Sequence, residues 1–476
     1  MILRNLLTMT GLNLAKAGAM VLISVLIAGA VPPHEYGLVA FAIPLMAFVT
    51  LLTDLGLSSA VVRHPGLDAR QAGTALGLMG LVGALAGLAV AAAAAPLERA
   101  LAMPGLAPVL LGFAAVTACG LWATVPRALL ERHLAYRRVA LVEAGALLAA
   151  LLGFGVALLA GLGIAALVAF HVLLQAVRAI GFTGLARGLA ERGGRLGAIA
   201  PLLRVGGWVF MTNLLGFAAR NLDRFLIGAV LGAAALGLYG LAYQFMTLPL
   251  MLISWPASGV LMATLSRMEH DAPGRAEVVC AVFTATATAV IPLMAFLAFG
   301  TRYPVGAFLS PQWAGLAELI AVLAPVGAVQ AIAAYNGAVL VARGRVRLNF
   351  LLGLLNGVAL CAAFAATVWL GLAALVRAYA VVALLVSAVM VAATCRAAGI
   401  DGHRFARCLL PGALASAAGL LAAALGGGFE ARSTAGYAVS ALAYLAAVVG
   451  VVLLLRGRLL ASLRVLVHTR VASAPR

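Results

Sequence analysis

Residues 72–95 read AGTALGLMGLVGALAGLAVAAAAA, a stretch without a charged side chain. Its length fits the roughly 20 apolar residues that a helix needs to cross the hydrocarbon core of a bilayer. Similar stretches fill most of the 476-residue chain, which is 65% hydrophobic and 10% charged, with a mean hydropathy of +1.13. Soluble domains carry about 25% charged residues, and no soluble fold of this length can bury so much apolar surface. The composition therefore predicts an all-α integral membrane protein.

The apolar stretches are separated by short segments rich in glycine, proline and arginine, and they predict about 14 transmembrane helices. The first stretch has some features of a signal peptide, but Lys16 interrupts it, so we expect it to be retained as the first helix. The predicted helices span residues 8–30, 38–62, 72–95, 106–126, 139–160, 163–183, 206–230, 237–262, 279–300, 315–341, 348–370, 372–394, 408–426 and 436–455.

Basic residues concentrate in every second connection between the predicted helices. One side carries several arginine clusters, whereas the other side has only Arg99, Arg302 and Arg432. Because cytoplasmic loops are enriched in Lys and Arg, the pattern predicts an inner-membrane protein with both termini in the cytoplasm. The same clusters account for the net charge of +18, which therefore does not indicate a nucleic-acid partner.

A weak internal repeat is visible at an offset of about 200 residues. Tyr36-Gly37-Leu38-Val39-Ala40 aligns with Leu236-Gly237-Leu238-Tyr239-Gly240, and Asn13 aligns with Asn213. Both copies start on the same predicted side of the membrane, so the repeat is parallel. It predicts an N-lobe of six helices over residues 1–203, a C-lobe of six helices over 204–407, and two further helices with a basic tail over 408–476.

The sequence lacks the features that are typical of several function classes. No G-x-x-x-x-G-K-[ST] motif occurs, so we expect no ATP hydrolysis. The five cysteines lie within or at the ends of apolar stretches and match no zinc motif or disulfide framework. The predicted external loops are too short to hold a catalytic domain. We therefore expect neither a metal nor a cofactor, and a transporter is favoured over an enzyme.

The clearest candidate site lies on the predicted seventh helix. Asn213, Phe217, Arg220 and Arg224 are spaced four, three and four residues apart, which places them on one helical face. Asp223 lies three residues from Arg220 and could pair with it as a counter-ion. The remaining positive charge suits a diphosphate, because arginine binds phosphate oxygens bidentately. The alternative is that Arg224 snorkels to the interface and that Arg220 and Asp223 form a structural pair.

Other ionisable residues within predicted helices are weaker candidates. Lys16 and Arg377 either line a cationic cavity or snorkel to the interface. Asp54 either provides a counter-ion or a Na⁺ or H⁺ coupling site, or it hydrogen-bonds the backbone next to Gly56, which we favour. Glu143 lies near a helix end, where solvation is expected.

Several short motifs resemble the polysaccharide transporter family within the multidrug/oligosaccharidyl-lipid/polysaccharide flippase superfamily. The central one is Arg220-Asn221-Leu222-Asp223-Arg224-Phe225-Leu226-Ile227-Gly228, which resembles the seventh helix of these transporters. The others are Leu231-Gly232, Leu236-Gly237-Leu238-Tyr239, Pro249, Glu35-Tyr36-Gly37, Asp54-Leu55-Gly56-Leu57, Arg63 and Ala342-Arg343-Gly344-Arg345.

The resemblance implies two six-helix lobes forming a V around a central cationic cavity. It also implies alternating access that flips undecaprenyl-pyrophosphate-linked oligosaccharide repeat units for O-antigen, capsule or exopolysaccharide export. Membrane lipids, a polysaccharide polymerase and glycosyltransferases are the expected partners. The alternatives are a cation-coupled multidrug exporter or a lipid II flippase of the same superfamily, and, from a different class, a membrane-embedded polymerase or glycosyltransferase.

Overall fold

The structure is a computed structural model in which the described part of the chain is helical. Twelve of its helical segments are long and apolar enough to cross a membrane. The chain is therefore a multi-pass α-helical membrane protein, as the composition predicts. It divides into two compact units, Met1–Gly237 and Leu238–Arg476. The described residues are 18, 19, 23, 26–54, 56–64, 66–191, 197, 210, 213, 214, 216, 217, 220–268, 272–430, 433–457, 459 and 460.

The twelve segments coincide with the predicted helices from 38–62 onward. One of them, Arg220–Arg267, takes in two predicted helices, and Gly232 interrupts it with a φ of 83° and a ψ of 177°. The predicted first helix, 8–30, lies mostly outside the described residues. The total of 14 helices therefore stays a prediction.

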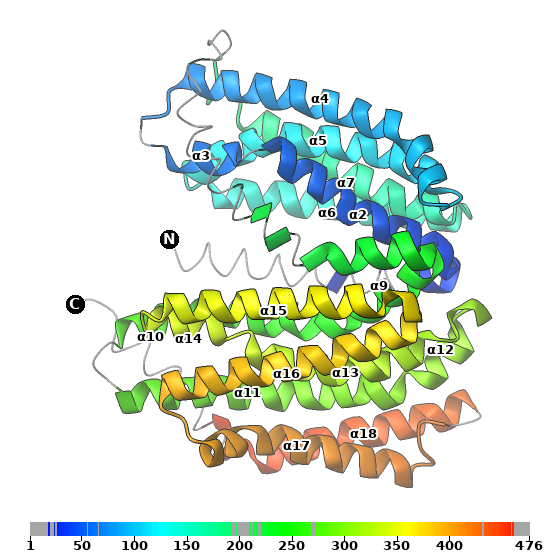
Figure 1. Cartoon of the computed structure of the whole chain (residues 1–476), viewed down its shortest axis with the longest axis vertical. Coiled ribbons are helices and arrows are strands. Elements are labelled where there is room, and N and C mark those ends of the chain that lie inside the picture. The colour runs from blue at the N-terminus through cyan, green and yellow to red at the C-terminus, as the bar shows by residue number, and fades with distance from the viewer. Residues whose placement is uncertain are drawn as a thin grey trace. The chain divides into compact units, whose positions relative to one another are not determined.

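The first unit is built mainly from long antiparallel helices (Figure 1). Its described elements are α2 (Pro33–Asp54), α3 (Leu57–Arg63), α4 (Ala69–Ala100), α5 (Leu106–Arg132), α6 (Tyr136–Leu159), α7 (Ile164–Leu185), the π-helical turn η2 (Ile227–Leu231) and the start of α9 (Gly232–Pro249).

Helix α4 shows how sequence determines a boundary and a packing face in this unit. Asp68 caps its first turn by accepting the Gln71 backbone N–H at 2.6 Å, and the Gln71 side chain accepts the Asp68 N–H at 3.2 Å. Further along, Gly83 and Gly87 lie against the backbone of α5, where an added Cβ would come within about 3 Å of a carbonyl oxygen. Small residues at a helix crossing allow the close backbone approach that stabilises helix pairs in lipid.

The second unit contains the remaining helices. Its elements are η3 (Leu250–Ser254), α10 (Trp255–Arg267), α11 (Ala272–Gly300), α12 (Arg302–Phe308), η4 (Pro311–Trp313), α13 (Leu316–Ala333), α14 (Asn336–Ala342), α15 (Val346–Thr367), η5 (Val368–Leu370), α16 (Leu372–Ala398), α17 (Gly402–Leu425) and α18 (Thr434–Leu454). Within this unit, α10, α14 and the turn between α16 and α17 lie at one end, and α12 lies at the other (Figure 1).

Large apolar side chains cover the outer faces of several helices. Leu148 and Leu152 of α6 are 62% and 71% exposed, and Leu442 and Leu445 of α18 are 65% and 58% exposed. Contiguous exposed apolar surface of this kind is rare in soluble proteins. In a bilayer these faces meet hydrocarbon, so their exposure fits the membrane assignment.

The unit boundary lies at a different place from the predicted lobe boundary. Along the chain, the first compact unit ends at Gly237, whereas the sequence repeat predicts boundaries after residues 203 and 407. Residue 217 and residues 220–237 belong to the first unit, and contacts with α2 hold them there, with Phe225 against Phe41 and Gly237 against Pro33. The lobe boundaries after residues 203 and 407 therefore remain predictions from the sequence repeat.

Candidate functional site

The predicted cationic face on the seventh helix is partly described. Arg220 is exposed, Arg224 is half-buried, and Asp223 is buried with 5% of its surface exposed. No ion pair joins Arg220 to Asp223 in the described part of the chain, where the Arg220 side chain is exposed and Asp223 is buried. Arg220 therefore presents its charge to the surroundings of the helix.

The guanidinium of Arg220 folds back over Gly216, one turn earlier. A Cβ on Gly216 would lie 3.1 Å from Nη1 of Arg220. Because Gly216 has no side chain, the guanidinium can lie close to the helix surface. The glycine thus helps set the position of the charged group.

A chain of aromatic rings fixes this part of the segment predicted as helix 206–230 against α2. The ring of Phe217 lies 5.5 Å from Phe48, and the ring of Phe225 lies edge-on to Phe41 at 5.7 Å. Phe217 and Phe225 are themselves 6.4 Å apart. Aromatic pairs at these separations add to the packing energy of buried area. The predicted shared face is thus divided, since Phe217 packs inward and Arg220 is exposed.

The backbone after Arg224 departs from an α-helix. Residues Ile227–Leu231 form a π-helical turn that ends at Gly232. Gly228 lies against Phe41, and a Cβ there would come within 2.6 Å of the Phe41 ring. Single π-helical turns occur often at functional sites, and this one directly follows the two arginines.

The other predicted site residues are scattered among the elements. Asn213 is exposed in the predicted helix 206–230, and Lys16 lies outside the described residues. Arg377 is an exposed residue of α16 in the second unit. Their shared role in binding remains a prediction.

Asp54 takes part in the break between α2 and α3. One carboxylate oxygen accepts the Ser58 hydroxyl at 2.8 Å, and the other accepts the Ser58 backbone N–H at 3.3 Å. Gly56 between them has a φ of 75°, a conformation that glycine adopts without steric cost. These are the contacts expected if Asp54 satisfies a helix terminus, although the coupling role remains a separate prediction.

A buried ion pair in the first unit was missed by the sequence reasoning. Glu143 of α6 is 1% exposed, which corrects the expectation that it is solvated. Its carboxylate accepts hydrogen bonds from Nη2 and Nε of Arg178 on α7, at 2.7 and 3.1 Å. Arg127 of α5 lies 3.4 Å away, so three helices meet at this carboxylate. Arg178 lies within the predicted helix 163–183. A charged residue inside a predicted transmembrane helix was the sequence feature that could have indicated a buried partner.

A second missed group lies in the second unit. Tyr379 stacks on Phe364 with ring centroids 5.5 Å apart, and Tyr243 lies 6.3 Å from Tyr379. The amide of Gln330 donates to the Tyr379 hydroxyl at 3.2 Å. Tyr243 and Gln330 are half-buried, so part of this aromatic–amide cluster is accessible. Its four members lie on four different helices, α9, α13, α15 and α16, so spacing could not reveal it.

Comparison with known proteins identifies the family. Residues 26–318 match the family described as "Polysaccharide biosynthesis protein". The chain belongs to this family. The match confirms the resemblance predicted from the motifs around Arg220, and it covers more than half of the chain.

Two relatives and one solved structure illustrate the relationship. The chain is 22% identical over 328 residues to the lipopolysaccharide biosynthesis protein WzxC of Escherichia coli (strain K12), covering 67% of this chain and 65% of that protein. It is 26% identical to the succinoglycan biosynthesis transport protein ExoT of Rhizobium meliloti (strain 1021), covering 61% and 59%. The aligned parts thus span less than two thirds of these relatives' length.

Its fold is similar to that of the lipid II flippase MurJ in an inward closed conformation. The TM-score is 0.69 at 13% identity, covering 93% of this chain and 97% of that chain. At this identity the likeness concerns the fold alone.

Proposed function

We propose that this protein is a flippase that moves undecaprenyl-pyrophosphate-linked oligosaccharide repeat units across the inner membrane for surface polysaccharide export. The observation that carries the proposal is the exposed Arg220 with the half-buried Arg224, both in the candidate membrane span Arg220–Arg267. A central arginine costs roughly 2.5–3.5 kcal/mol on insertion scales. A diphosphate ligand would offset that cost, because each guanidinium can bind two phosphate oxygens.

Family membership supports a sugar-linked substrate. WzxC and ExoT carry names that refer to lipopolysaccharide biosynthesis and succinoglycan transport, respectively. In the proposal, Arg220 and Arg224 bind the pyrophosphate while the lipid tail remains in the bilayer. Separately, within the second unit, we propose that Tyr243 and Gln330 can contact a sugar, since a ring face and an amide suit a polyhydroxylated ligand.

Transport would proceed by alternating access, with both termini in the cytoplasm and with Na⁺ or H⁺ as a proposed driving ion. A polymerase and glycosyltransferases would act on the same lipid-linked sugar before or after its transfer. In this proposal the protein is a transporter and catalyses no chemical reaction itself.

A reconstituted transfer assay tests the proposal. Vesicles containing the protein and a polyprenyl-pyrophosphate-linked fluorescent oligosaccharide would be exposed to a membrane-impermeant quencher, and the accessible fraction followed over time. Arg220→Ala with Arg224→Ala should abolish transfer, and the double lysine variant should restore part of it, because lysine keeps the charge but loses the bidentate contact. Arg302→Ala is the matched control, since Arg302 is an exposed arginine paired with Glu430.

The alternatives give different results in the same vesicles. Transfer of lipid II at an equal or higher rate would favour a lipid II flippase, and cation-driven dye efflux would favour a multidrug exporter. Growth of the oligosaccharide chain would indicate a polymerase. Unchanged transfer in the double alanine variant would rule out the proposed arginine site.

A further inference from the structure

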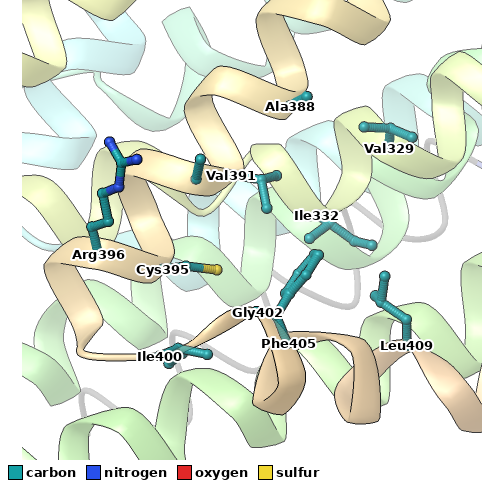
Figure 2. Close-up of a pocket in the computed structure, with 11 residues that line it drawn as sticks. Val329, Ile332, Ala388, Val391, Cys395, Arg396, Ile400, Gly402, Phe405 and Leu409 are labelled. Carbon is teal, nitrogen blue, oxygen red and sulfur yellow. The ribbon is translucent and has the colours of Figure 1, made fainter.

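A cavity opens within the second unit between α13, α16 and α17 (Figure 2). Its volume is ≈ 440 Å³, and its walls are almost entirely apolar. Val329 and Ile332 come from α13, Val391 from α16, and Phe405 and Leu409 from α17. Water in such a space would lack the two to four polar partners that it needs. The cavity therefore suits a hydrocarbon chain.

The edge of the cavity is cationic. Arg396 extends from α16 at one side, and its guanidinium points away from the apolar side chains (Figure 2). Arg404 lies one residue before Phe405 in the first turn of α17, and both arginines are exposed. Asp401 is committed to the helix terminus, where its side chain accepts the Arg404 backbone N–H at 2.6 Å. The positive charge thus exceeds the negative charge beside an apolar space.

This cavity lies at the basic end of the second unit. The turn between α16 and α17 is at the same end as the C-termini of α10, which ends at Arg267, and α14, which is followed by Arg343 and Arg345 (Figure 1). Positive-inside placement predicts that this end faces the cytoplasm. Cytoplasmic leaflets contain anionic lipids, and basic pockets between transmembrane helices on that side bind their headgroups.

We propose that this cavity binds an anionic phospholipid of the leaflet at this end. One acyl chain lies among Ile332, Phe405 and Leu409, and the phosphate lies against Arg396 and Arg404. The proposal concerns a bound membrane lipid and does not depend on the transported substrate. Such a lipid would fill the space between α16 and α17 and hold the two helices together.

Native mass spectrometry of the purified full chain in mild detergent tests the proposal. The protein would be titrated with phosphatidylglycerol or phosphatidylcholine of identical acyl chains, and the bound fraction of each lipid measured. The wild type should bind phosphatidylglycerol about 5-fold more tightly, the difference expected for roughly one arginine near an anionic headgroup. Arg396→Gln should remove most of this preference, whereas Arg345→Gln, an exposed arginine at the same end, should retain it.

A cavity-filling variant tests the apolar half of the site. Ala388 lines the cavity, so Ala388→Phe should weaken the binding of both lipids by a similar factor. The neighbouring Val389 is 48% exposed and does not line the cavity, so Val389→Phe is the matched control.

Three outcomes would overturn the proposal. They are an equal effect of Arg396→Gln and Arg345→Gln, full lipid binding by Ala388→Phe, or displacement of phosphatidylglycerol from the wild type by a stoichiometric amount of polyprenyl phosphate. The last result would assign the cavity to an isoprenoid lipid.

Discussion

Gly37 and Gly237 pack against each other in a reciprocal contact. A Cβ on Gly37 would overlap the carbonyl oxygen of Ala233, and a Cβ on Gly237 would overlap the carbonyl oxygen of Pro33. Gly37 and Gly237 lie 200 residues apart in the sequence, and so do Pro33 and Ala233. A contact in which residue i meets j and j meets i is the mark of a twofold relationship. The aligned glycines of the sequence repeat thus meet directly.

The first prediction concerns this crossing. Gly37→Ala and Gly237→Ala should each lower the free energy of unfolding by about 1–3 kcal/mol or more, because the new methyl group has no space and the backbones must separate. The midpoint of thermal unfolding in detergent measures the effect. Gly145→Ala is the control, since no atom lies within 4 Å of the added Cβ on this α6 residue. It should leave stability unchanged or raise it, as an alanine in a helix does. Equal behaviour of all three variants would contradict the close contact.

The second prediction concerns the buried pair of Glu143 and Arg178. Removing one partner leaves a buried charge uncompensated, so Arg178→Met should destabilise the protein by about 3–5 kcal/mol, less any part that Arg127 compensates. The double variant Glu143→Leu with Arg178→Met should be clearly more stable than Arg178→Met alone, because neither charge then remains. A double-mutant cycle on thermal unfolding measures this coupling.

The surface pair of Arg302 and Glu430 gives the comparison for that cycle. These side chains are 69% and 80% exposed, so their coupling should be at most about 1 kcal/mol. If both cycles gave the same small coupling, the burial of Glu143 would have no energetic consequence, and the prediction would be wrong.

The third prediction addresses Asp54. Because the two oxygens of its carboxylate accept the N–H and the hydroxyl of Ser58, Asp54→Asn should preserve folding and sugar-lipid transfer, since the amide oxygen can still accept the N–H and the amide NH2 can donate to the hydroxyl oxygen. Asp54→Ala should cost about 1 kcal/mol of stability through the lost helix-terminal contact. Transfer assays with and without a Na⁺ or H⁺ gradient check this. Loss of gradient-driven transfer in a well-folded Asp54→Asn variant would instead favour the coupling role.

The fourth prediction follows from the aromatic–amide cluster. Tyr243→Phe should retain most transfer of the oligosaccharide lipid, because the ring face remains, whereas Tyr243→Ala should reduce it by about 5- to 10-fold, corresponding to roughly 1–1.5 kcal/mol of lost aromatic contact. Binding of a pyrophosphate lipid without sugar should be unaffected in both variants. If Tyr243→Ala weakened both lipids equally, the tyrosine would act through the fold.

Much of this protein could be predicted from the sequence by itself. The uncharged stretch at 72–95 becomes most of α4, because lipid requires every backbone group to be paired within the segment and only a helix of about 20 residues achieves this. The family was predictable from short motifs such as Arg220 to Gly228, since those residues keep their local spacing whatever the tertiary arrangement. Periodicity could also place Arg220 and Arg224 on a common face.

Only the tertiary structure decided which polar groups meet. The ion pair of Glu143 and Arg178 joins residues 35 positions apart, and the hydrogen bond of Gln330 to Tyr379 joins residues 49 apart. Helical periodicity gives the face on which a residue lies but not the helix that this face contacts. In lipid, apolar faces carry little information about partners, because hydrocarbon solvates them as well as another helix does. Close packing of glycines and pairing of buried charges therefore select the helix contacts, and these appear only when the chain is folded.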